Sequence, residues 1–146
     1  MTDKRIIDSF INKYHLGGNI ERVKWVSDNE SISAKFINDS QSLVGKVISK
    51  NFKFPVGEFG IYSTSTLSKL LGILENEVMF DVNKEGGTPS KFIIADTSMD
   101  ISFNLADPQV IPNVPTINKM EGNVEIELNE EFTTKFIKAK DAVGEE

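Results

Sequence analysis

The chain has 146 residues, and its 16 Lys and Arg against 22 Asp and Glu give a net charge of −6. This length predicts one ordinary domain, or one domain with part of another, with room for a hydrophobic core. There is no cysteine, which excludes disulfides and thiolate metal sites. No run approaches the roughly 18 apolar residues that a membrane helix needs, so we expect a soluble protein.

The charge is unevenly distributed along the chain. Residues 1–62 hold nine basic and seven acidic side chains (+2), whereas residues 63–146 hold seven and 15 (−8). A negative total argues against a nonspecific nucleic-acid binder, because neutralising phosphates requires clustered cations. The placement of charge decides the question, since an acidic outer surface with a mildly basic inner one would give the same total.

The first predicted elements are one helix and four short strands. Apolar residues between Asp3 and Tyr14 recur at helical spacing, and residues 17–19 (Gly-Gly-Asn) are expected to end that helix. Strands are predicted at 20–27, 31–37, 43–49 and 58–62, with a tight hairpin turn at 28–30.

A second helix is predicted over residues 64–76. It is capped by Ser63 or Thr64, and its leucines at i, i+3, i+4 and i+7 predict a buried face. Three more strands are predicted at 77–82, 90–96 and 99–105. Two β-rich groups, each introduced by a helix, predict an α+β fold with the helices packed on one face of an antiparallel sheet.

After a proline-bearing linker the pattern restarts. Shifting the sequence by 65 residues places Gly57 on Gly122, Ile61 on Ile126, Thr64 on Asn129, Leu67 on Phe132 and Leu71 on Phe136. The repeat predicts a strand at 124–128 followed by a helix at 129–143. The domain organisation predicted from this is a first domain at 1–106, a linker at 107–121, and the beginning of a truncated second domain at 122–146.

The order of elements over residues 58–120 resembles the first domain of the DNA sliding clamp of T-even-type tailed phages. The resemblance rests on this order and on two short sequence matches, Leu71-Gly-Ile-Leu74 and Ala106-Asp-Pro108, and it extends over about residues 3–146. It implies a processivity factor that encircles duplex DNA, nonspecifically and without catalysis, and that tethers a DNA polymerase. It also implies a trimeric ring when full length, a separate clamp loader, no cofactor or metal, and a place in the cytoplasm, that of the host cell if the protein is viral.

The resemblance further implies which residues face DNA and which face partner proteins. Helices line the hole in this family, here 3–15, 64–76 and 129–143, and the DNA-facing candidates are Lys4, Arg5, Lys13, Lys69, Lys135 and Lys138. A few cations near the phosphates hold the protein on DNA, and because they do not contact the bases the protein can still slide along the duplex. The family accepts partner tails in hydrophobic pockets near the interdomain linker, where Ile111, Val114 and Ile117 are the candidates here.

Few other residues indicate a catalytic, metal-binding or nucleic-acid-binding role. The single histidine, His15, is expected to be a solvated residue at a helix end, since one His without Cys builds no typical metal site. Trp25 is expected to pack at an edge or interface, in preference to acting as a stacking platform for nucleic acid. No convergent set of His, Cys or carboxylates predicts an enzyme. The alternative function is a small β-rich phage structural or protein-interaction module with no role on DNA.

Overall fold

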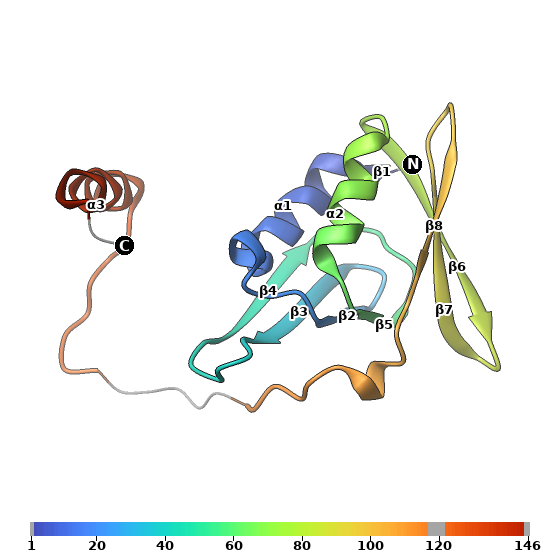
Figure 1. Cartoon of the computed structure of the whole chain (residues 1–146), viewed down its shortest axis with the longest axis horizontal. Coiled ribbons are helices and arrows are strands. Elements are labelled where there is room, and N and C mark those ends of the chain that lie inside the picture. Colours follow the sequence, from blue (N-terminus) through green and yellow to red (C-terminus); the bar gives the residue numbers. More distant parts are fainter. Residues whose placement is uncertain (1, 117–121, 145–146) are drawn as a thin grey trace. The chain divides into compact units, whose positions relative to one another are not determined.

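The computed structural model describes residues 2–116 and 122–144 (Figure 1). It is an α+β structure with two four-stranded antiparallel sheets and three α-helices, and the predicted α+β class is confirmed. The helices of the first unit pack on two sheets where the sequence analysis expected one. The chain consists of two compact units, Met1–Pro115 and Thr116–Glu146.

The first unit is built from two copies of a β-α-β-β-β arrangement. In the first copy, a short strand and a helix precede three strands: β1 (Thr2–Asp3), α1 (Lys4–His15), β2 (Val23–Ser27), β3 (Ser31–Ile37) and β4 (Val44–Lys50). The second copy consists of β5 (Gly57–Ile61), α2 (Thr64–Ile73), β6 (Glu77–Glu85), β7 (Thr88–Ala95) and β8 (Asp100–Asn104). Two short 3-10 turns, η1 (Leu16–Gly18) and η2 (Pro108–Val110), complete this unit.

The two copies exchange their first strands. The sheet orders are β4-β3-β2-β5 and β1-β6-β7-β8, so the strand that precedes each helix pairs with the strand that follows the other helix. All pairings are antiparallel. Each sheet therefore needs both halves of the unit, and neither half can complete its hydrogen bonds alone.

Side-chain caps and apolar spacing define both helices. Asp3 caps α1 and Ser63 caps α2, each accepting a hydrogen bond from a backbone N–H of the first turn. The buried positions repeat every three or four residues: Ile7, Phe10, Ile11 and Tyr14 in α1, and Thr64, Leu67 and Leu71 in α2. α1 ends at His15 because Leu16 adopts the left-handed conformation, with a φ of 50°, one residue before the glycines that were expected to end it.

An aromatic cluster forms the centre of the core and joins the two halves. The ring of Trp25 lies 5.4 Å from Phe10, 6.0 Å from Phe54 and 5.9 Å from Phe92, measured between centroids. Trp25 is fully buried, and so is Phe92 in the other sheet. The expectation that Trp25 lies at an edge or interface is wrong, because strand β2 is interior to its sheet and this side of it faces the helices.

The second unit contains one regular element among its described residues. Helix α3 (Glu130–Val143) is capped by Asn129 and ends at Gly144, which confirms the helix expected at 129–143. The strand expected at 124–128 is not formed, and its apolar side chains are exposed, as is the whole of α3. A strand needs a neighbouring edge for its backbone hydrogen bonds, and no strand within 122–144 offers one. The predicted division into domains stays a prediction.

Candidate functional site

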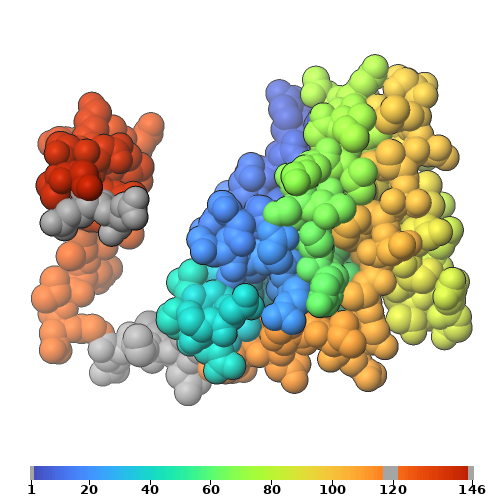
Figure 2. All heavy atoms as spheres, viewed as in Figure 1, coloured from blue at the N-terminus to red at the C-terminus, as the bar shows by residue number. Residues whose placement is uncertain are grey.

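Helices α1 and α2 lie side by side in the first unit (Figures 1 and 2). In the same view, Figure 2 shows residues of both helices, blue and green, exposed on one face. Four of the six cations predicted to face DNA belong to these helices, and each has a different environment.

Lys4 joins the two helices. Its Nζ donates hydrogen bonds to the carbonyl oxygens of Leu71, at 3.1 Å, and Leu74, at 2.7 Å. The last carbonyl groups of a helix carry partial negative charge, so the lysine ammonium stabilises the C-terminal end of α2. The ammonium group of Lys4 thus has a structural partner within the unit.

Arg5 is paired with the residue that caps its own helix. Its Nη2 lies 2.7 Å from Oδ2 of Asp3, and its backbone N–H donates to Oδ1 of Asp3. The hydrogen bond from the guanidinium lowers the pKa of Asp3 and raises that of Arg5. Both groups are solvent-accessible, so water screens this pair strongly.

Lys13 and Lys69 are exposed and form no ion pair within the described part of the chain. Arg5 and Lys13 border a hollow of about 240 Å³ between α1 and strand β4, which also exposes parts of Ile6 and Ile48. The structure therefore brings Arg5 and Lys13 to the β4 side of α1. Lys69 lies on α2.

The remaining two predicted cations lie on α3 in the second unit. Lys135 Nζ is 3.0 Å from Oε1 of Glu131, one helical turn earlier, and both side chains are exposed. Lys138 is also exposed. Exposed pairs of this kind contribute only about 0.3–0.5 kcal/mol. No result tests the DNA-facing roles of these six residues, which stay predictions.

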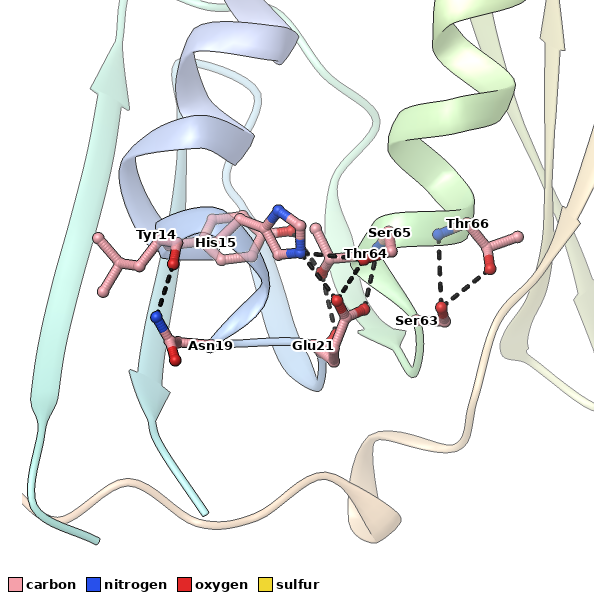
Figure 3. A network of polar contacts seen from close by, with 9 residues as sticks. Tyr14, His15, Asn19, Glu21, Ser63, Thr64, Ser65 and Thr66 are labelled. Carbon is pink, nitrogen blue, oxygen red and sulfur yellow. Dashed lines mark hydrogen bonds and ion pairs between the residues drawn. The ribbon is translucent and has the colours of Figure 1, made fainter. Parts of the chain in front are cut away.

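A polar cluster at the C-terminal end of α1 contains the only histidine (Figure 3). Nε2 of His15 lies 2.9 Å from Oε1 of Glu21 and 3.3 Å from Oγ of Ser65, and Ser65 also donates to Glu21 through both its hydroxyl and its backbone N–H. His15 is largely buried here, so the expectation of a solvated residue is wrong. Burial raises the pKa of Glu21, but the hydrogen bonds from His15 and Ser65 outweigh it and lower the pKa overall.

This cluster has the residue types of a nucleophile–base–acid triad without its geometry. In such a triad the histidine uses one ring nitrogen for the nucleophile and the other for the carboxylate. Here Glu21 and Ser65 both contact the same nitrogen, and Ser65 donates directly to the carboxylate. The arrangement fixes the end of α1 to the first turn of α2 and does not activate the serine.

A buried chain of hydrogen bonds continues from this cluster into the core. Thr64 Oγ1 donates to the backbone carbonyl of Glu21, Tyr14 donates to Thr64 Oγ1 at 3.1 Å, and Trp25 Nε1 donates to the Tyr14 hydroxyl at 3.2 Å. Burial raises the pKa of Tyr14 well above its usual range. Every polar group in this chain of hydrogen bonds has a partner, so the network fixes the positions of α1, β2 and α2 relative to one another.

The segment after β8 crosses the outer face of the β4-β3-β2-β5 sheet. Ala106 pairs with Gly60 on β5, and residues 111–114 then line a hollow of about 420 Å³. Ile111 is almost fully buried there, and Val114 is half-buried. The structure thus brings these two predicted partner-binding residues together. The third, Ile117, lies outside the described residues.

Three lysines line the same hollow. Lys24, Lys35 and Lys46 occupy directly paired positions on strands β2, β3 and β4, so they form one row across the outer face of the sheet. We call the hollow lined by this row, by Val26 and by residues 111–114 the lysine groove. We did not predict this groove from the sequence. Alternation places Lys24 and Lys35 outward on their strands, but the alignment of all three depends on two hairpin registers.

Among residues 2–116 and 122–144, no three side chains of the metal-binding kinds lie together as a metal site would require. No helix in the same ranges is long and apolar enough to cross a membrane.

Comparisons with known proteins show a similarity of fold to solved structures. No protein-family model matches the chain, and no curated protein matches it. Among solved structures, the chain is similar to the DNA polymerase III subunit beta from Pseudomonas aeruginosa, with a TM-score of 0.47 and 17% sequence identity. The matched region covers 83% of this chain and 31% of that one, so the chain spans less than a third of the length of the protein it matches.

Proposed function

We propose that this chain is part of a DNA sliding clamp, a polymerase processivity factor that encircles duplex DNA without catalysis. The observation that carries the proposal is the layout of the first unit. Its β-α-β-β-β arrangement occurs twice, with both helices side by side, and within the described residues nothing pairs with the outer edges of β4 and β8. Open strand edges join readily to other chains or units, which a closed ring requires.

In this proposal the DNA contact is weak and made by helices. Lys13 and Lys69 are exposed, and the Arg5 guanidinium is accessible beside Asp3. Contacts of this kind follow the phosphate backbone, carry no sequence information and fall with salt, which suits a protein that slides. Lys135 and Lys138 would add to them from α3.

The tethering role is assigned to the lysine groove. Pro112 and Val114 give it apolar surface, and the almost fully buried Ile111 also lines it. A polymerase or a clamp loader would use this groove in turn, each inserting a short segment of its own chain. The chain itself then requires no nucleotide or metal.

Charge reversal on the helices tests the proposal. The variant combines Arg5→Glu, Lys13→Glu and Lys69→Glu, and omits Lys4 because its loss would destabilise α2. We expect a ring assembled with the unaltered chain to stay longer on closed circular duplex than on the same DNA after linearisation. The triple variant should lose this retention, and the salt slope of binding should fall by about 0.9 for each phosphate contact removed.

The matched control is Lys84→Glu on strand β6, which reverses one exposed charge away from both helices. Its retention should equal that of the unaltered chain. Retention by the triple variant, or equal retention on circular and linear DNA, would contradict the clamp proposal.

A protein-interaction module with no DNA role is the second candidate. It is favoured by the engagement of Lys4 and Arg5 with groups of their own chain, which leaves few unpaired cations on α1. The same experiment decides between the two, because this candidate predicts no measurable affinity for duplex DNA at low salt.

A further inference from the structure

The lysine row is unfavourable in the free protein. Residues paired directly across neighbouring strands lie about 5 Å apart, and like charges at such positions destabilise a sheet. Lys24 is relieved by Glu58, whose Oε2 lies 3.7 Å from its Nζ. Lys35 and Lys46 face each other across β3 and β4, and neither forms an ion pair within the part of the chain that the structure describes. An anionic group placed between them would remove this repulsion.

Apolar surface adjoins the row. Val26 follows Lys24 by two residues on the same face of β2, which places it about 6.6 Å along the strand. It is 40% exposed, although it lies on an interior strand of the sheet. Ile111, Pro112 and Val114 complete the apolar side of the groove. The groove therefore offers cations and apolar contacts within a span of two or three residues of an extended peptide.

We propose that the lysine groove binds an acidic–apolar segment of a partner protein, with its carboxylates on Lys35 and Lys46 and a large apolar side chain against Val26 and residues 111–114. The inference rests on the tethering role proposed for the groove and names the chemistry of the segment that it accepts. Carboxylates two residues apart in an extended peptide are separated by about 6.6 Å, within reach of two flexible lysines.

The composition of the groove favours a peptide over nucleic acid. Glu58 already pairs with Lys24, which leaves only Lys35 and Lys46 in the groove for an anionic ligand. The apolar side of the groove would contact the polar sugar–phosphate backbone without gain, whereas it would bury an aliphatic or aromatic side chain. The number of lysines without a carboxylate partner is also small for a salt-dependent nucleic-acid site.

The test uses this chain and a labelled octapeptide in which two Glu residues lie two positions apart and are followed by two Leu residues, measured by fluorescence anisotropy. The matched peptide carries Gln in place of Glu. We expect the Glu peptide to bind about tenfold more tightly at low salt, the usual effect of a charge-assisted hydrogen bond. Lys35→Gln and Lys46→Gln should each remove most of this difference, whereas Lys84→Gln, with the same charge change on β6, should preserve it.

Several outcomes would overturn the inference. These are equal binding of both peptides, unaltered preference in the Lys35→Gln and Lys46→Gln variants, and displacement of the peptide by a single-stranded oligonucleotide whose own binding needs the same lysines. Thermal melting verifies folding, and the variants should melt no lower than the unaltered chain because they remove like-charge repulsion. If the unaltered chain bound the Glu peptide but were not retained on circular DNA, the clamp proposal alone would be rejected. If it were retained on circular DNA but did not prefer the Glu peptide, only the groove inference would be rejected.

Discussion

The two halves of the first unit share a topology and differ in charge. Moving along the sequence by 60 residues takes the cap Asp3 to the cap Ser63, and the buried Ile7 and Ile11 to the buried Leu67 and Leu71. Yet residues 1–56 carry nine basic and six acidic side chains (+3), whereas residues 57–106 carry three and seven (−4). Apolar spacing and strand pairing therefore define the repeat, whereas the surface charge differs between the two halves.

The halves also differ in how their helices are held. Tyr14, near the end of α1, has a hydroxyl that links Trp25 to Thr64. The corresponding residue 60 positions later, just after α2, is Leu74, which has no polar group on its side chain. The first half thus supplies Tyr14, Glu21 and Trp25 to the polar network and the three lysines to the lysine groove. The second half supplies apolar packing and an acidic sheet. Mutations at residues that connect the halves, or that belong to only one of them, test this difference.

The largest effect is expected at the residue that unites the halves. Trp25→Ala removes a buried ring in contact with Phe10, Phe54 and Phe92, and should lower the free energy of unfolding by about 3–5 kcal/mol. Chemical denaturation measures it, with Tyr62→Ala, an exposed aromatic residue, as the control that should change stability by less than about 0.5 kcal/mol.

Because β1 and β5 are exchanged between the halves, the Trp25→Ala protein should still unfold in one cooperative transition. Two separated transitions in residues 2–115 would show that the halves fold independently, and the comparison of interlocked copies would then fail.

A smaller effect is expected where the linker approaches the second half. The added methyl group of Gly60→Ala would collide with the backbone carbonyl oxygen of Ala106, so stability should fall by about 1–3 kcal/mol. The same change should weaken peptide binding in the lysine groove, because Ala106 leads into residues 111–114. Gly72→Ala is the matched control on α2. It meets open space and should raise stability by about 0.5–1 kcal/mol. Equal effects of both substitutions would argue against a close approach at Gly60.

Most elements of the first unit could be predicted from local patterns. Helical spacing from Asp3 to Tyr14 gave the start of α1 to within one residue, and the strand at 31–37 agrees with β3. Local patterns failed where a partner decides the outcome. Alternating Val124, Ile126 and Leu128 predicted a strand, but alternation alone cannot supply the neighbouring strand that backbone hydrogen bonds require.

The candidate sites were less predictable than the fold because they depend on contacts between distant residues. Nothing near Lys4 in the sequence indicates that its ammonium binds carbonyls of residues 71 and 74. The alignment of Lys24, Lys35 and Lys46 likewise requires the register of three strands. Trp25 was expected at an edge or interface because it lies in a short run of charged and apolar residues, whereas its burial follows from an aromatic cluster drawn from both halves.

The smallest effect is expected in acid and concerns the contact between the halves at Glu21. Hydrogen bonds from His15 and Ser65 hold its pKa below the ordinary value of 4.5 despite the opposing effect of burial. A carboxylate with a lowered pKa stabilises the folded state above the unfolded pKa, and this contribution is lost as pH falls through the folded pKa. The difference in unfolding free energy between the unaltered chain and Glu21→Gln should therefore be constant at neutral pH and shrink below about pH 4.5. Asp3, Asp28 and Asp96 also have lowered pKa values, but both proteins carry them, so they cancel in the difference. A difference that stays constant throughout the acid range would show that the carboxylate of Glu21 contributes no charge-dependent link between α1 and α2.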